Sequence, residues 1–333
     1  MDDLVAEIER VAVASGFSGA VRVDAADDIV VDAAYGLADR AHGIANRADT
    51  QFAIASGTKG LTALLIVRLV ELGVLALTTS ARSILGRDLP LVADDVTVEH
   101  LLSHRSGIGD YLDEEQVADV TDYVMPVPVH QLATTEQFLR VLDGHPTKFA
   151  AGTAFSYCNG GYVLLALLAE RSAGCPFHEL VVEHVCMPAD MGDTEFLRSD
   201  ELPARAAIGY LDSDQPRTNV FHLPVRGNGD GGVYSTTADI AAMWRAVVGG
   251  RIVGLELTRE MTRAHSEISD GWAYGMGFWL DPSSGSVVLE GGDAGVSFRS
   301  IHRLRDRVTA TVVSNSTEGA WPLARLLRDS LRG

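Results

Sequence analysis

Short hydrophobic runs lie at both ends of the chain, and longer ones lie between them. Residues 18–23 and 28–33 are rich in β-branched side chains and are separated by a few polar positions, which predicts a β-hairpin. Four more strands are predicted near the end of the chain, at 277–280, 286–289, 297–302 and 307–313. The connections between these runs are short, so we expect antiparallel pairing rather than crossover helices.

The remaining apolar positions follow a helical pattern. Residues 56–71 are apolar on nearly every face, which predicts a helix buried in the middle of the fold. Arg68 and Glu71 interrupt this stretch, so it is interpreted as a core helix and not as a membrane span. Thr97 is the expected N-cap of a helix that runs to Gly107, and residues 159–172 predict a helix that ends at Gly174. Further helices are expected at the two ends of the chain.

These elements predict an α/β (α+β) fold, in which an antiparallel sheet built from both ends of the chain is flanked by the terminal helices. A mostly helical second lobe is expected beside the sheet. The sequence assigns residues 1–78 and 205–333 to the sheet lobe and residues 79–204 to the helical lobe. An active-site cleft is expected between the two lobes.

Charge and cysteine content narrow the function. The chain has 27 basic and 45 acidic residues, a net charge of −18, which excludes the basic footprint of a nucleic-acid binder and disfavours an anionic membrane as partner. Its three cysteines show no C-x-x-C spacing, so neither a disulfide framework nor a thiolate metal site is expected. The start of the chain lacks the pattern of a signal peptide. We therefore predict a cytoplasmic protein with a small-molecule substrate and no metal or cofactor; the oligomeric state stays open.

Lysine is rare in this chain, because only Lys59 and Lys148 occur among the 27 basic residues. Lysine can be tuned to give or take a proton, which arginine cannot. Lys59 follows Ser56 by one helical turn at the start of the apolar helix, so its amine is expected to lie within reach of the serine hydroxyl. A buried amine favours its neutral form and can activate a serine as nucleophile. The alternative is that Ser56 caps the helix and Lys59 extends to solvent.

A second pair of polar residues lies about a hundred positions later. Tyr157 and Asn159 are two apart and point to the same side of an extended segment. A phenolate beside an ammonium group would be a suitable proton carrier, and the Asn159 amide could donate to a substrate carbonyl. The alternatives are a packed ring for Tyr157 and a helix N-cap for Asn159.

These motifs resemble those of the serine β-lactamase and penicillin-binding-protein superfamily, most closely the class C β-lactamases and their esterase and D-aminopeptidase relatives. Residues 101–108, 151–159 and 231–239 are similar to further motifs of that branch. The resemblance implies that Ser56 is the acylated nucleophile and that Lys59 and Tyr157 share the proton transfers. It also implies that Asn159 contacts the substrate amide.

This chain departs from the family at the third motif. Relatives have Lys-Thr-Gly or His-x-Gly, whereas this chain has leucine at 289, Glu290 and then Gly291. A backbone N–H near Gly291 or Gly292 can still complete an oxyanion hole with that of Ser56, as the resemblance implies. The cation that holds a substrate carboxylate in relatives is missing, and Glu290 would repel such a carboxylate if it faced the cleft.

We therefore predict a serine hydrolase that cleaves an ester or amide through an acyl-enzyme on Ser56, with weak or no β-lactamase activity. A true β-lactamase or D-Ala carboxypeptidase is the first alternative. A catalytically silent binding protein with the same fold is the second.

Two further groups of residues carry alternatives. His100 and His104 have the i, i+4 spacing of metal ligands, but no third ligand is evident nearby, so they are interpreted as helix residues, with a protonated His104 near the helix end. The aromatic residues between 272 and 279 could line an acyl pocket or belong to the sheet core.

Overall fold

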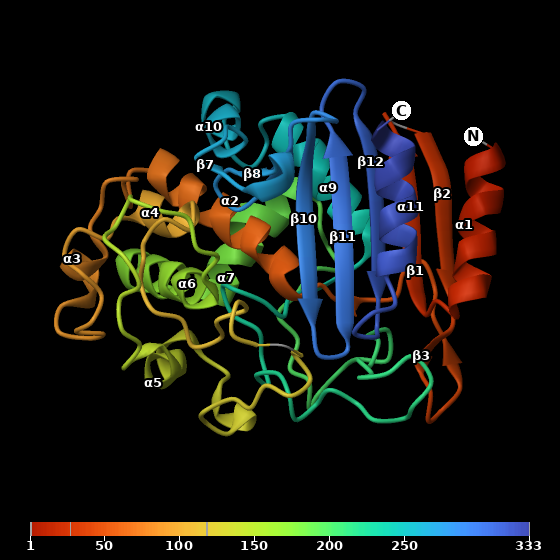
Figure 1. The fold of residues 1–333 in the computed structure, drawn as a ribbon, viewed down its shortest axis with the longest axis horizontal. Helices are drawn as coiled ribbons and strands as arrows, with labels where there is room; N and C mark the ends of the chain where they lie inside the picture. Colours follow the sequence, from red (N-terminus) through yellow and green to blue (C-terminus); the bar gives the residue numbers. More distant parts are fainter. Residues whose placement is uncertain (1, 27, 118, 333) are drawn as a thin grey trace.

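The structure is a computed structural model that describes residues 2–26, 28–117 and 119–332. An eight-stranded sheet dominates it, with the order β2-β1-β12-β11-β10-β9-β8-β7 and antiparallel pairing between all neighbours (Figure 1). The two ends of the chain meet in it, since Val21 pairs with Val312. The predicted fold class is thereby confirmed. The strands of this sheet are β1 (Gly19–Ala25), β2 (Asp28–Tyr35), β7 (Ser266–Glu267), β8 (Ala273–Tyr274), β9 (Trp279–Asp281), β10 (Ser286–Asp293), β11 (Val296–Arg303) and β12 (Val308–Ser314).

Helices from the two chain ends cover one face of the sheet. Helix α1 (Asp2–Ser15) packs against α11 (Trp321–Arg332), and both lie over the strands (Figure 1). Their apolar side chains, such as Ile8 and Leu323, share one buried cluster with Val21 of β1. Burial of one apolar stripe per helix accounts for this layer.

The other face of the sheet packs against α9 (Thr237–Val248), and α2 (Thr58–Glu71) lies deeper in the same core. The Trp244 indole N–H of α9 donates to Ser300 Oγ of β11 at 2.8 Å, which satisfies a polar group inside this layer. The prediction of a buried helix at 56–71 is confirmed, except that the helix begins at Thr58. A 3₁₀ turn, η1 (Ala55–Gly57), precedes it and contains Ser56.

The middle of the chain is less helical than predicted. Helix α6 (Asn159–Ala173) ends at Gly174 as expected, and the left-handed conformation of Gly174 explains the stop. The predicted N-cap Thr97 begins α4 (Val98–Leu102), but that helix ends five residues before Gly107. The other helices are α3 (Ala81–Leu85), α5 (Leu139–Leu142), α7 (Phe177–Val181), α8 (Met187–Ala189) and α10 (Leu255–Met261).

Short elements connect these helices. They are the strands β3 (Leu37–Asp39), β4 (Ile44–Ala45), β5 (Phe52–Ala53) and β6 (Tyr234–Ser235), the 3₁₀ turns η2 (Val129–Gln131), η3 (Thr135–Phe138) and η5 (Ser269–Gly271), and the π-helical turn η4 (Val182–Cys186). Pairing of β5 with β6 brings the segment before Ser56 beside the segment that follows residue 230. Among the described residues, no helix has both the length and the apolar character needed to cross a bilayer. The lobe boundaries at 78 and 204 stay a prediction.

Candidate active site

Ser56 and Lys59 lie together at the start of the buried helix. The Lys59 Nζ is 2.9 Å from the Ser56 Oγ, so the predicted contact is present. Ser56 is half-buried and reaches a pocket, whereas Lys59 is only 2% exposed. The residue before the serine, Ala55, has φ 44, a left-handed conformation that is strained for alanine and turns the chain sharply at this point.

Lys59 is held by oxygen atoms that carry no net charge. Besides Ser56, its Nζ lies 2.7 Å from the Asn159 Oδ1 and 2.7 Å from the backbone oxygen of Asp230. Burial lowers the pKa of Lys59 from its ordinary value, although nearby carboxylates, Asp230 first among them, oppose this shift. The result is an amine whose neutral form is favoured relative to an exposed lysine.

Tyr157 completes the predicted group of catalytic side chains. Its ring lies between His104, at 4.4 Å between centroids, and Trp279, on which it stacks at 5.8 Å. The Lys59 Nζ lies 4.9 Å from the centroid of the Tyr157 ring. Burial raises the pKa of Tyr157 well above its ordinary value, and a hydrogen bond with Ser56 only partly opposes this. Burial therefore favours the neutral phenol of Tyr157 over the phenolate that the sequence suggested.

Asn159 makes neither of the contacts that the sequence suggested, a free amide for a substrate carbonyl or a helix N-cap. Its amide Nδ2 donates to the Leu112 backbone oxygen at 3.0 Å and to Glu114 Oε1 at 3.0 Å, so the N–H groups expected to face a substrate carbonyl are engaged within the protein. Asn159 is also not the N-cap of α6, which is Cys158 and makes no side-chain cap. The position of the Asn159 carbonyl against Lys59 is instead its main contact with the site.

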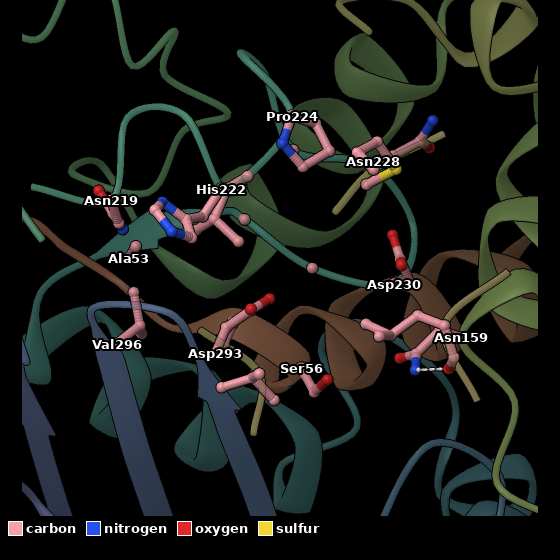
Figure 2. Close-up of a pocket in the computed structure, with 18 of the residues that line it drawn as sticks. Ala53, Ser56, Asn159, Asn219, His222, Pro224, Asn228, Asp230, Asp293 and Val296 are labelled. Carbon is pink, nitrogen blue, oxygen red and sulfur yellow. Dashed lines mark hydrogen bonds between the residues drawn. The ribbon is translucent and has the colours of Figure 1, made fainter. Parts of the chain in front are cut away.

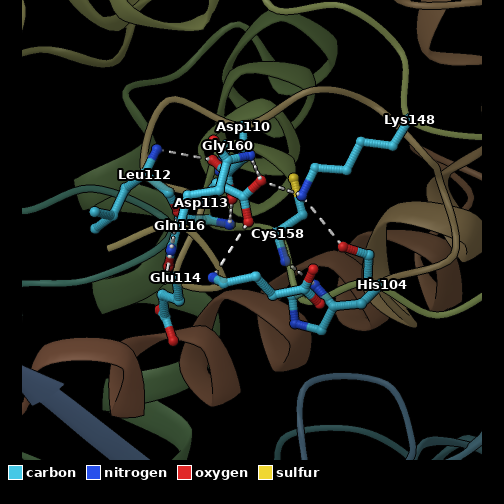
Figure 3. Close-up of polar contacts among 12 residues, drawn as sticks. His104, Asp110, Leu112, Asp113, Glu114, Gln116, Lys148, Cys158 and Gly160 are labelled. Atoms are coloured by element: carbon cyan, nitrogen blue, oxygen red, sulfur yellow. Dashed lines mark hydrogen bonds and ion pairs between the residues drawn. The ribbon is translucent and has the colours of Figure 1, made fainter. Parts of the chain in front are cut away.

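The start of α6 is capped by a residue from a distant loop. The two carboxylate oxygens of Asp110 accept the backbone N–H groups of Asn159 and Gly160 at 2.6 and 2.8 Å (Figure 3). Burial raises the pKa of Asp110 to about 6, and these hydrogen bonds moderate the rise. Asp110 thereby joins the loop that carries Glu114 to the helix that carries Asn159.

Strand β10 brings Gly291 and Gly292 to the site. Gly291 packs directly on η1: a Cβ at this position would overlap the Ile54 carbonyl oxygen and lie 2.8 Å from the Ser56 backbone N. Strand β9 pairs with β10 only over residues 286–288, so the later part of β10 has a strand partner on one edge only. Backbone N–H groups of that free edge and of Ser56 are thus near one another.

The side chains of β10 alternate between two faces, and this corrects the expectation for Glu290. Leu289 is 2% exposed and packs on Gly60 of α2, so the position of the family cation is filled by an apolar core side chain. Glu290 pairs with Arg299 of the neighbouring strand, and Arg299 lies over the Trp321 ring of α11, on the face opposite the site. The acidic residue on the Ser56 side is Asp293, two positions after Gly291.

An open pocket begins at Ser56 (Figure 2). Its lining comes from segments assigned by the sequence to both lobes, namely residues 53–56, 111–114, 120–125, 197–199, 219–234 and 292–296. Among the described residues that line it, three are carboxylates, Glu114, Asp230 and Asp293, and none is arginine or lysine. Tyr111 donates its hydroxyl hydrogen to the Asp230 carboxylate. Asp230 directly precedes the motif at 231–239, and Asp293 ends β10 two residues after the third motif, but no pattern in the sequence assigned their carboxylates to a pocket. Glu114 lies in a loop with no motif around it.

The remaining candidates have roles within the protein. His100 accepts from the backbone N–H of Thr97 and belongs to a capping box. His104 is not the protonated residue that was expected: burial lowers its pKa well below the ordinary value, its Nδ1 accepts from the Cys158 N–H at 3.1 Å, and its Nε2 lies 3.2 Å from the Tyr274 hydroxyl. Tyr274 and Phe278 are buried, and no aromatic residue between 272 and 279 lines the pocket.

The antiparallel sheet and the Ser56–Lys59 pair beside an open pocket define the class of proteins that share the serine β-lactamase fold. A family model described as Beta-lactamase matches residues 5–330. The chain therefore belongs to the beta-lactamase family, and the predicted family is confirmed.

Relatives within this family have several names. Esterase EstB of Burkholderia gladioli is 36% identical over 191 residues, which are 56% of this chain and 48% of the esterase. A D-aminopeptidase of Brucella anthropi is 28% identical over 325 residues, which are 93% of this chain and 58% of that protein. The crystal structure of a penicillin-binding protein from Bacillus halodurans superposes with a TM-score of 0.92 at 33% identity, covering 97% of this chain and 99% of that one. This chain thus spans about half of the length of the two curated relatives.

Proposed function

We propose that the chain is a serine hydrolase that cleaves an ester or amide through an acyl-enzyme on Ser56. The observation that carries the proposal is the 2.9 Å contact between Ser56 Oγ and the buried Lys59 Nζ at the mouth of a pocket. An esterase and a D-aminopeptidase among the relatives support the same class of reaction.

Lys59 acts as the base in this proposal. A neutral amine has two N–H donors and one lone pair. The two donors are directed to the Asn159 Oδ1 and the Asp230 backbone oxygen, each at 2.7 Å, which leaves the lone pair for the Ser56 hydroxyl hydrogen. As Ser56 Oγ forms its bond to the carbonyl carbon of the substrate, the hydroxyl proton moves to Lys59 Nζ, and negative charge develops on the carbonyl oxygen.

The leaving group needs a proton when its bond to the carbonyl carbon breaks. Tyr157 is a neutral phenol beside Ser56 and Lys59, so it can donate its proton to the leaving group and recover one from the Lys59 ammonium. A water molecule then attacks the acyl-enzyme and gives a proton to the regenerated amine. Cleavage of the acyl bond returns that proton to Ser56 and restores the starting state.

The oxyanion is assigned to two backbone donors. They are the N–H of Ser56 and one N–H of the free edge of β10 at Gly291 or Gly292. The direct packing of Gly291 on η1 supports this assignment because it brings the two backbone segments together without an intervening side chain.

The charge around the pocket disfavours substrates that carry a carboxylate. Leu289 provides no cation, and Asp293 presents a carboxyl group on the Ser56 side. We therefore expect uncharged esters and amides to be hydrolysed more efficiently than β-lactams or peptides that end in D-Ala. The three free cysteines support a cytoplasmic location, which is part of the same proposal.

A nitrophenyl ester and a chromogenic cephalosporin test this function with the wild type and Ser56→Ala. The proposal expects ester turnover by the wild type, its loss in the variant and slow cephalosporin turnover. Equal ester turnover by both proteins would exclude Ser56 as the nucleophile, and rapid cephalosporin turnover would restore the β-lactamase alternative. A fluorophosphonate adduct on Ser56, detected by mass spectrometry, distinguishes an enzyme from the silent binding protein, which would form none.

A further inference from the structure

The pocket that begins at Ser56 changes in character along its length. Its carboxylates, those of Glu114, Asp230 and Asp293, belong to segments that contact the catalytic group. Residues 120–125 and 219–225 line a second part of the pocket, and none of their described lining side chains carries a charge at neutral pH. The imidazole of His222 in this part favours its neutral form, because burial lowers its pKa. The pocket is therefore acidic beside Ser56 and uncharged further away.

The uncharged part of the pocket is lined mostly by apolar and aromatic side chains. Figure 2 shows His222 and Pro224 on the opposite side of the pocket from Ser56. The two segments that build this part are joined, because the His222 ring hydrogen-bonds the Thr121 backbone. Together they form one continuous surface for an apolar ligand. Its apolar and aromatic side chains include Val120, Tyr123, Met125, Val220, Leu223 and Pro224.

Two strongly exposed apolar side chains lie at the outer edge of this surface. Phe221 and Val124 are 83% and 82% exposed, the highest values among the large hydrophobic side chains of the described residues. Each of them lies between two residues that line the pocket. A single exposed apolar residue is common, but here the two most exposed ones belong to the two segments that border one pocket. A ligand that covers this edge would remove their apolar surface from water.

We propose that this pocket selects esters or amides that carry an unbranched, uncharged hydrocarbon chain of medium length. The chain lies between residues 120–125 and 219–225, and Phe221 and Val124 contact its far end. The inference rests on the proposed hydrolase function and names the substrate class of that site. The chain belongs to either the acyl part or the leaving group, and the experiment decides between these two.

The position of the apolar surface supports a substrate chain as its occupant. The surface is continuous with the space at Ser56, where the reacting carbonyl is held in the proposed function. A chain attached to that carbonyl can therefore extend along it without leaving the pocket. A charged group at the far end of the chain would find no partner of opposite charge among the described lining residues of the two segments.

The test uses two series of esters at concentrations below those at which they aggregate. Nitrophenyl butanoate and octanoate vary the acyl chain, whereas butyl and octyl acetate vary the alcohol. In one series, the wild type should favour the longer ester by roughly tenfold in kcat/KM, because the added methylenes partly leave water. The series that shows this preference identifies the side of the ester that carries the chain. If neither series favours the longer ester, the inference is overturned.

Variants of the exposed edge test the part played by its two side chains. Phe221→Ser and Val124→Ser should each lower the ratio of longer to shorter ester by about threefold. Val13→Ser is the matched control, because Val13 is 74% exposed but lies on α1, which packs on α11 over the sheet. The control should keep the wild-type ratio. Equal ratios in all three variants would exclude Phe221 and Val124 as contacts of the chain.

The other candidate occupant of this edge is a second copy of the chain. Sedimentation velocity of the wild type and Phe221→Ser tests for it. A wild-type dimer that dissociates in Phe221→Ser, with no change in the ratio of longer to shorter ester, would assign the edge to self-association and overturn the inference. A sedimentation coefficient that is the same in both proteins, together with a lowered ratio, supports the substrate chain.

Binding measurements separate this inference from the proposed function. Calorimetry on Ser56→Ala with N-methylbutanamide, N-methyloctanamide and N-octylacetamide measures selection of the chain without turnover. If the wild type hydrolyses none of the esters, but an octyl compound binds best and binds more weakly after Phe221→Ser is added, the hydrolase proposal alone fails. If no amide binds, or the octyl compounds bind no better than N-methylbutanamide, the selection of an apolar chain is overturned.

Discussion

The two lysines of this chain occupy opposite environments. Lys59 is 2% exposed, and its amine lies within hydrogen-bond distance of three oxygens that carry no formal charge. Lys148 lies in a loop, 2.8 Å from the Asp113 carboxylate and 3.3 Å from the Ser156 hydroxyl. Burial lowers the pKa of Lys59, whereas the hydrogen bond and charge of Asp113 outweigh burial and raise the pKa of Lys148.

This difference shows that the nearest neighbours decide what a lysine does. Carboxylates also surround Lys59, but the groups in contact with its amine are a hydroxyl, an amide and a backbone carbonyl. Such neighbours accept hydrogen bonds without stabilising the ammonium as an ion pair would. The same side chain thus serves as a structural cation at Lys148 and is suited to the proposed role of a base at Lys59.

Removal of each lysine in turn gives the largest expected effect. Lys59→Met should lower kcat/KM for a nitrophenyl ester by about 10³-fold, because the serine loses its proton acceptor. Lys148→Met should stay within about threefold of the wild type, since its partners lie outside the pocket. Steady-state kinetics checks both variants, with circular dichroism to confirm that they fold. Retention of a tenth or more of the activity in Lys59→Met would show that another group is the base.

The difference between the two lysines should become smaller if Lys59 is given a charged partner. Asn159→Asp places a carboxylate 2.7 Å from the amine and makes its surroundings resemble those of Lys148. The pKa of Lys59 should rise, so less neutral amine is present at pH 7, and activity should fall by roughly 10²-fold. The alkaline rise of the pH–rate profile should move to higher pH. Asp113→Asn is the control, and a profile that moves equally in both variants would contradict the assignment of Lys59.

The carboxylates near Lys59 should make the stability of the fold depend on pH. Burial, with added repulsion from Asp230 and Glu114, raises the pKa of Asp293 from 3.8 to about 7. Between these values the folded state binds more protons than the unfolded chain, so stability falls as the pH rises toward 7. Asp293→Asn should therefore add on the order of 2 kcal/mol at pH 8 and almost nothing at pH 4. Urea unfolding at the two pH values measures this, and an equal gain at both would refute the cause given.

The smallest effect is expected from the Lys148 ion pair. Its side chains are partly exposed, at 24% for Lys148 and 12% for Asp113, so the pair should contribute about 0.5–1 kcal/mol. The pKa of Asp113 is lowered although burial opposes it, because Lys148 hydrogen-bonds its carboxylate. The contribution is therefore present above pH 4 and is lost as the pH falls through the lowered pKa. Urea midpoints of the wild type and Lys148→Met should differ at pH 7 and converge near pH 2.

Much of the fold could be predicted because it depends on local patterns. The β-branched runs predicted β1, β2 and the last strands, and the all-apolar segment predicted α2 as a buried helix. The early end of α4 could not be predicted, because it depends on His104. That residue adopts φ 54, and its ring is fixed by Cys158 and Tyr274, which are distant in the sequence.

The residues of the site also fall into two groups, those that local spacing predicts and those that only the folded chain brings together. Ser56 and Lys59 are neighbours on one turn, so their spacing alone predicted the contact. Asp110, Asp230 and Asp293 reach the site from three separate segments. Each lies within two residues of a family motif, but no local pattern shows that these carboxylates come together. The N-cap alternative for Asn159 does not hold, and the sequence gives no sign that the Asp110 carboxylate, almost fifty residues earlier, already occupies that end of α6.

The bare backbone of Gly291 has a consequence for how the site tolerates change elsewhere. Gly291 has no side chain, so the backbone of β10 packs directly against the turn at Ser56. The position of the strand therefore sets the position of that turn. A substitution in α1 or α11 that displaces the sheet by a few tenths of an ångström would therefore move both proposed oxyanion donors together, the N–H of Ser56 and that of Gly291 or Gly292. The spacing between them would be conserved while the rest of the pocket adapts.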